Sequence, residues 1–120
     1  RDDLVNIQDS VDMTIDGSIY VLKKNGEIIK LLNGKLNNFS LKIIEPPLIN
    51  PTKIFTSDDV KNIYILEPGN KRVVIVDKDG NFIKQYSSEK FNNLKDFIVL
   101  EKEKRIYVLN DTTIFGFSIK

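Results

Sequence analysis

The segment Ile63-Tyr64-Ile65-Leu66 has two close copies in the chain, Ile19-Tyr20-Val21-Leu22 and Ile106-Tyr107-Val108-Leu109. The tyrosines of successive copies are 44 and 43 residues apart. Each copy is a short apolar run that combines β-branched residues with a tyrosine, and strands favour these residue types. The chain therefore contains an internal repeat of strand-forming segments.

Turn-forming residues divide each repeat into strands at matching places. In the first repeat, the dipeptides Asp16-Gly17, Asn25-Gly26 and Asn33-Gly34 favour two-residue hairpin turns. The predicted strands are 12–15, 18–23, 27–32 and 39–44 in the first repeat, 52–56, 62–66, 72–76 and 82–86 in the second, and 96–100, 105–109 and 113–119 in the third. Four antiparallel strands in a period of about 40 to 50 residues are typical of one β-propeller blade.

The sequence thus predicts an all-β chain of about three four-stranded propeller blades in a single domain, residues 1–120. The repeats cover approximately 11–45, 51–87 and 94–120, residues 4–7 form a spare outer strand, and the third repeat lacks its fourth strand. Propellers have about four to eight blades. Three blades are therefore expected to be a segment of a larger propeller, an open arc, or half of an oligomeric ring made by two copies.

A proline-rich segment joins the first repeat to the second. Pro46, Pro47 and Pro51 exclude a central strand or helix there, so we expect a stiff connection between blades. A domain boundary at this segment is the alternative. The repeat register continues across it, which favours the single domain.

Charge and composition narrow the possible partners. The chain has 18 basic and 17 acidic residues, and its net charge of +1 gives no long-range field that would attract a nucleic acid or an anionic membrane. No apolar run approaches the roughly 20 residues that span a bilayer. We expect no nucleic-acid partner and no membrane segment. The absence of cysteine excludes disulfides and thiolate metal sites and leaves the cellular compartment open.

The residue types needed for most hydrolytic chemistry are missing. The sequence has no histidine, which removes Ser-His-Asp and Cys-His catalysis and the usual zinc sites. Residues 77–81 look like the beginning of a calcium loop, but the twelfth position is Ser88 rather than glutamate, and Asp79-Gly80 is better explained as a hairpin turn. We therefore predict no catalytic residue, no metal site and no cofactor.

The stretch 62–82 resembles an NHL-type propeller repeat, because it contains a strand, an acidic residue, Gly69-Asn70-Lys71-Arg72-Val73, a second strand and Asp79-Gly80. The other two repeats keep the Ile-Tyr strand but lack the Asn-x-Arg-Val element. The resemblance implies a scaffold that binds protein, RNA or carbohydrate, although a minority of similar propellers are metal-dependent lyases or lactonases. Within this element, we expect Arg72 to pair with Glu67 or Asp77 across the hairpin.

The predicted function is a non-catalytic interaction or ligand-binding module, as a fragment of a larger protein. One alternative is a calcium-dependent propeller enzyme of the lactonase or lyase type. Another is a structural spacer or half-ring that forms a homodimer, in which 4–7 and 113–119 would pair. We expect a protein or small ligand on the face where the loops between blades gather, at Lys53, Glu67, Asn70, Lys71, Arg72 and Asp96.

The tyrosines of the repeated segment have two interpretations. Tyr20, Tyr64 and Tyr107 could form a platform on which nucleic-acid bases stack, or they could pack between blades. Because each lies inside a predicted central strand, we expect them to pack between blades.

Overall fold

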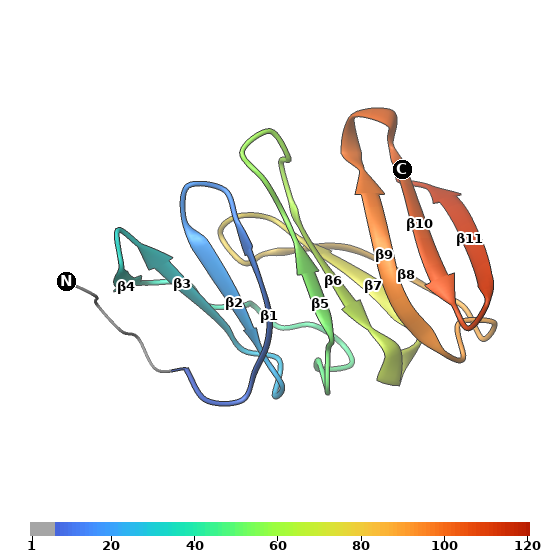
Figure 1. The fold of residues 1–120 in the computed structure, drawn as a ribbon, viewed down its shortest axis with the longest axis horizontal. Helices are drawn as coiled ribbons and strands as arrows, with labels where there is room; N and C mark the ends of the chain where they lie inside the picture. Colours follow the sequence, from blue (N-terminus) through green and yellow to red (C-terminus); the bar gives the residue numbers. More distant parts are fainter. Residues whose placement is uncertain (1–6) are drawn as a thin grey trace.

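The computed structural model describes residues 7–120, which form eleven strands in three antiparallel sheets (Figure 1). The first sheet contains β1 (Ser10–Ile15), β2 (Ile19–Lys23), β3 (Ile28–Leu32) and β4 (Lys35–Asn37). The second contains β5 (Lys53–Phe55), β6 (Ile63–Glu67), β7 (Arg72–Val76) and β8 (Phe82–Ser87). The third contains β9 (Leu94–Leu100), β10 (Arg105–Asn110) and β11 (Thr113–Ser118).

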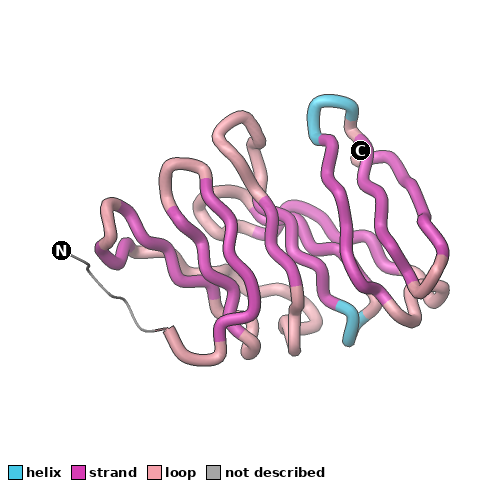
Figure 2. The backbone as a smooth tube through the Cα atoms, in the orientation of Figure 1, coloured by secondary structure: helices cyan, strands magenta, loops and turns pink. Residues whose placement is uncertain are grey.

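Each sheet is a meander, since the order of its strands in space is their order in the sequence. The sheets stand side by side as blades, with β1, β5 and β9 as neighbouring strands (Figure 1). Two short 3-10 helices, η1 (Pro68–Asn70) and η2 (Glu101–Glu103), are the cyan segments of Figure 2. Within residues 7–120, no helix is long and apolar enough to cross a membrane.

The all-β class and the three-blade arrangement predicted from the repeat are confirmed. The third sheet has three strands, as expected from the sequence. The spare strand predicted at 4–7 falls on residues that the structure does not describe, apart from Ile7, which belongs to no strand.

The predicted outer strand of the first blade was wrong. This strand is β4, at Lys35–Asn37, and not the segment 39–44. Asn33 and Gly34 both have positive φ, 54° and 76°, so the hairpin turns at once and the chain pairs immediately after it. Residues 39–44 instead leave the sheet and run along the second blade, where the Lys42 N–H donates to the Gly80 carbonyl (2.9 Å).

Two apolar cores lie between the three blades. Successive residues of a strand point to opposite faces, so Ile63 and Ile65 of β6 pack with the first blade while Tyr64 and Leu66 pack with the third. Every residue of β6 and β7 is buried as a result. The second blade is therefore the centre of the structure.

The repeated tyrosines pack as expected in the first two blades. Tyr20 belongs to the core between the first and second blades, and Tyr64 to the core between the second and third. Both are buried, whereas Tyr107 is half-buried because the described chain contains no fourth blade to cover it. Tyr20 and Tyr64 therefore have no face available for stacking on a base.

Candidate functional site

The predicted loop face exists at the end of the blades that carries the β2–β3 turn, η1 and the β10–β11 turn, at the lower edge of Figure 1. The connections between blades also reach this end. The Asn50 N–H donates to the Lys24 carbonyl (3.1 Å), and the Asn93 N–H donates to Asn110 Oδ1 (2.8 Å). This end therefore combines three turns with two linkers.

At this face, Arg72 and Glu67 form a buried ion pair, so Glu67 is the partner among the two that the sequence offered, Glu67 and Asp77. The two residues are directly opposite in the β6–β7 register, and η1 joins them. Arg72 Nε donates to Glu67 Oε1, and the side chains are 1% and 0% exposed. A buried charge without its partner is costly, so each member of the pair depends on the other.

The pair fastens the proline-rich linker to the second blade. Glu67 Oε2 accepts hydrogen bonds from the Ile49 N–H (2.6 Å) and from Asn70 Nδ2 (2.8 Å). Arg72 donates to the carbonyl oxygens of Glu45 and Pro46. Arg72 Nη1 also donates to Gln85 Oε1 on β8 (2.6 Å). These two side chains hold the linker in place and are enclosed by the protein.

The six predicted binding residues do not form one site. Glu67, Asn70 and Arg72 come together in the buried cluster. Lys53 is half-buried at the start of β5, Lys71 pairs with exposed Glu89 (3.0 Å), and Asp96 is exposed on β9. Their binding role remains a prediction. A ligand in solvent could reach Lys71 and Asp96, whereas Glu67 and Arg72 are closed off.

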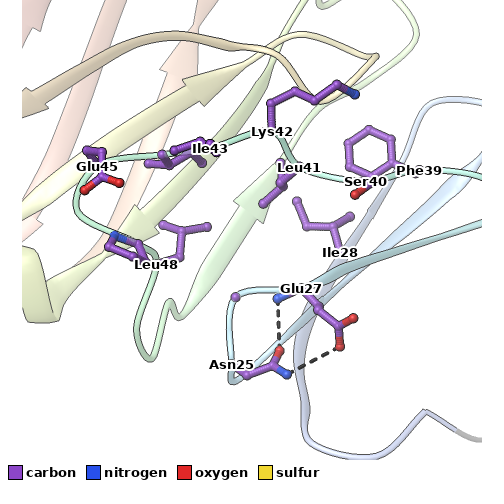
Figure 3. A pocket seen from close by; sticks show the side chains of 13 residues that line it. Asn25, Glu27, Ile28, Phe39, Ser40, Leu41, Lys42, Ile43, Glu45 and Leu48 are labelled. Carbon is purple, nitrogen blue, oxygen red and sulfur yellow. Dashed lines mark hydrogen bonds between the residues drawn. The ribbon is translucent and has the colours of Figure 1, made fainter.

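A groove of about 560 Å³ opens between the first blade and the linker that follows it (Figure 3). One wall is the β2–β3 turn with the start of β3, and the other is the linker. The lining residues are Asn25, Gly26, Glu27, Ile28, 39–45, Pro47 and Leu48. We call this feature the linker groove.

The linker groove exists because β4 is short. β4 pairs only with Lys30, Leu31 and Leu32 of β3, whereas β8 pairs along all of β7. At the open end of β3, the Lys23 N–H donates to the Glu27 carbonyl (2.9 Å). Backbone groups alternate in direction along an antiparallel ladder, so the N–H and C=O of Ile28 point away from β2. The first blade therefore has an incomplete outer edge beside the groove.

The groove has an apolar interior and a charged rim. Ile28 and Leu41 point toward each other across it, with Leu48 near its floor (Figure 3). The linker packs tightly against the turn, since a Cβ on Gly26 would lie 2.8 Å from Leu48 Cβ. Ile43 stands on the linker with 83% of its surface exposed. Such a groove can take apolar side chains of a ligand while its rim contacts polar groups.

Three ionisable side chains lie on the rim. The Glu27 carboxylate accepts hydrogen bonds from Lys23 Nζ (3.4 Å) and Asn25 Nδ2 (3.4 Å). Lys42 Nζ donates to the Asp79 carbonyl (3.3 Å), and Glu45 is exposed. These three residues were not expected at a site, because 39–44 was predicted as the outer strand of the first blade, which would leave no groove between that blade and the linker. The Asn33-Gly34 dipeptide was the available signal, since a two-residue turn starts the next strand at Lys35.

The structure gives Asp77, in the β7–β8 turn, a structural role. Hydrogen bonds from the Asn81 backbone and side chain and from the Asp79 N–H hold the pKa of Asp77 below its usual range. The carboxylate thereby closes the hairpin turn. Across residues 7–120, no group of three or more His, Cys, Asp or Glu side chains is placed to hold a metal ion.

No protein-family model and no curated protein matches the chain. Solved β-propeller structures are similar to it. A chain of the nidogen/laminin complex has a TM-score of 0.61 and 14% identity over 82% of this chain and 38% of its own length. Streptogramin B lyase has a TM-score of 0.56 and 15% identity, covering 92% of this chain and 41% of its own.

Inactive H270A virginiamycin B lyase from Staphylococcus aureus with quinupristin has a TM-score of 0.55 and 17% identity. That match covers 97% of this chain and 43% of the lyase. The chain thus spans less than half the length of these propellers. At such identities the similarity shows the propeller fold and nothing about activity.

Proposed function

We propose that this protein is a non-catalytic binding module and that the linker groove takes an extended segment of a protein partner. The observation that carries the proposal is the incomplete outer edge of the first blade, where the backbone of Ile28 faces an apolar groove. An extended peptide can add to an exposed sheet edge through its main chain while pockets select its side chains. The resemblance of residues 62–82 to an NHL-type repeat supports an interaction role.

The groove also suggests which peptides it prefers. Its interior, between Ile28, Leu41 and Leu48, suits an apolar side chain. Its rim has two carboxylates, Glu27 and Glu45, and one ammonium group, Lys42. We expect a segment with alternating apolar residues and a basic residue beside one of the carboxylates, because opposite charges fix orientation and register.

A library of random hexapeptides displayed on phage tests this function. We expect the full chain to enrich alternating apolar sequences, and binding to be lost in Ile43→Asp, which places a charge on the linker wall. The matched control is Ile83→Asp on β8 of the second blade, where the isoleucine is 48% exposed and does not line the groove. Equal binding to both variants, or no enrichment, would contradict the proposal.

The absence of catalysis is part of the proposal and has its own test. A propeller enzyme of the lactonase or lyase type would need several oxygen ligands around a calcium ion. Binding to the folded state would raise the midpoint of a thermal melt by mass action. We expect no shift at millimolar calcium, and a clear rise would favour the enzyme.

A further inference from the structure

The third blade exposes a face that its counterparts bury. Leu22, Leu66 and Leu109 occupy the same position of the repeat, two residues after the repeated tyrosine. Their exposed fractions are 0%, 0% and 36%. The first two leucines are covered by the following blade, and in the described chain no blade follows the third. We call the surface formed by Asp96, Ile98, Leu100, Tyr107, Leu109 and Ile114 the third-blade face.

The first blade exposes the complementary face, on the side that a preceding blade would cover. Ile54 of β5 and Met13 of β1 are equivalent, since both pair with the residue after the repeated tyrosine. Ile54 is 4% exposed because the first blade covers it, whereas Met13 is 68% exposed. We call the surface formed by Val11, Met13, Ile15 and Leu36 the first-blade face. The chain therefore has both halves of a blade-to-blade junction, each without a partner among the described residues.

The junction between the first two blades shows how such halves join. Asp12 Oδ2 accepts a hydrogen bond from the Ile54 N–H (2.9 Å). Thr14 Oγ1 accepts one from the Thr56 N–H (3.0 Å) and donates to the Thr56 carbonyl (2.9 Å). Two side chains of β1 thus bind the backbone of the neighbouring innermost strand.

The third-blade face has an aspartate, Asp96, at the position that Asp12 occupies in this junction. Asp12 pairs with Leu22 and Asp96 pairs with Leu109, so the two aspartates are equivalent. Asp96 is exposed and accepts the N–H of its own neighbour, Phe97, through Oδ1 (2.8 Å). By the same register, Ile98 takes the place of Thr14, and Ile15 takes the place of Thr56.

We propose that two copies of the chain bind head to tail, with the third-blade face of each copy covering the first-blade face of the other. Two identical junctions would close a ring of six blades, which is within the usual range of about four to eight. At each junction, Asp96 would accept the Met13 N–H of the second copy, and Ile98 would pack on Ile15. Pairing of two third-blade faces is disfavoured, because it would bring the Asp96 carboxylates of both copies together.

Light scattering of the purified chain across a concentration series tests the ring. We expect twice the 13.8 kDa mass of one chain. Ile15→Lys and Ile98→Glu alter residues that are 60% and 61% exposed, so each variant should fold. Each variant alone should be monomeric, because both junctions would bury a charged side chain against an isoleucine. Their equimolar mixture should form a dimer again, because one junction is then wild type and the other pairs lysine with glutamate. Circular dichroism verifies that each variant is folded.

Two further variants keep the test independent of folding defects. Asp96→Ala should weaken dimerisation about a hundredfold, because a charged acceptor is lost at both junctions and each loss costs about tenfold. Ile43→Lys lies in the linker groove, outside both faces, and should leave the dimer intact. A wild-type monomer at every concentration would overturn the proposal, and so would a dimer that survives Ile15→Lys or a mass that grows without limit.

Discussion

The two linkers between blades are held at the same position of the repeat by different chemistry. Glu67 follows Leu66 in the second blade, and Asn110 follows Leu109 in the third. The Glu67 carboxylate accepts the Ile49 N–H of the first linker, and the Asn110 amide accepts the Asn93 N–H of the second. Both side chains are buried. The position thus has one structural role, accepting an N–H of the linker, which a carboxylate performs in the second blade and an amide in the third.

The carboxylate and the amide differ in the partners that each requires when it is buried. The Glu67 carboxylate is buried and needs a counter-charge, which Arg72 supplies while also binding two carbonyls of the linker. The Asn110 amide is neutral and donates as well as accepts, to the Lys90 carbonyl (3.1 Å) and Asn92 Oδ1 (3.2 Å). An acidic residue here requires the arginine, and an amide does not. This explains physically why the second repeat has the Asn-x-Arg-Val element and the third lacks it.

The largest expected effect comes from removing the counter-charge. Arg72→Met leaves the Glu67 carboxylate buried without its cation, and we expect a loss of about 3 to 5 kcal/mol in the free energy of unfolding. Urea unfolding of the wild type and the variant measures this loss. A cost below about 1 kcal/mol, the size of an exposed pair, would mean that the pair does not hold the linker.

Placing a carboxylate at position 110 of the third blade, without an arginine to pair with it, should have a smaller effect. Asn110→Asp keeps an acceptor for the Asn93 N–H but loses the donor and buries a carboxylate, at a cost of about 2 kcal/mol near neutral pH. Burial favours the protonated acid. The variant should therefore be closer to the wild type in acid and lose stability as the pH rises. A variant as stable as the wild type at neutral pH would remove the contrast between the two linkers.

The smallest effect concerns an ion pair between the first two blades. Lys78 Nζ pairs with Asp16, and Tyr20 OH and the Ser18 N–H also donate to this carboxylate. Burial alone would raise the pKa of Asp16, but these hydrogen bonds and the Lys78 charge lower it below its ordinary value of 3.8. The stabilisation is therefore present above pH 3.8 and is lost as the pH falls through the lowered pKa.

Lys78→Met removes this ion pair. We expect a loss of at most about 1 kcal/mol near neutral pH and a weaker decline of stability in acid than in the wild type. Urea midpoints at neutral and acidic pH measure both quantities. If the variant declines as steeply as the wild type, the acid sensitivity belongs to other groups.

The comparison of the linkers also shows what the sequence can predict. The repeated Ile-Tyr segment and the Asp-Gly and Asn-Gly turns predict the strands to within a few residues, since alternation and turn chemistry are local properties. That Arg72 pairs with an acidic residue near its own hairpin was predictable for the same reason, with Glu67 and Asp77 as the two alternatives. Local patterns therefore recover the blades.

The linker groove was not predictable in this way. Phe39, Leu41 and Ile44 are apolar at alternate or near-alternate positions, as in a strand, but they pack against the core between two blades. That packing depends on the second blade and on Arg72, which binds the Glu45 and Pro46 carbonyls and is 27 and 26 residues away from them in the sequence. Only the Asn33-Gly34 turn signalled locally that the outer strand starts earlier.

Amide hydrogen exchange of Ile49 and Asn93 tests most directly the claim that the two linkers are held independently by Glu67–Arg72 and by Asn110. In the wild type, both amides should be protected, because each donates to a buried side chain. In Arg72→Met, under conditions in which the variant stays folded, exchange at Ile49 should accelerate while exchange at Asn93 stays unchanged. Unchanged exchange at Ile49, or an equal acceleration at both amides, would contradict the account.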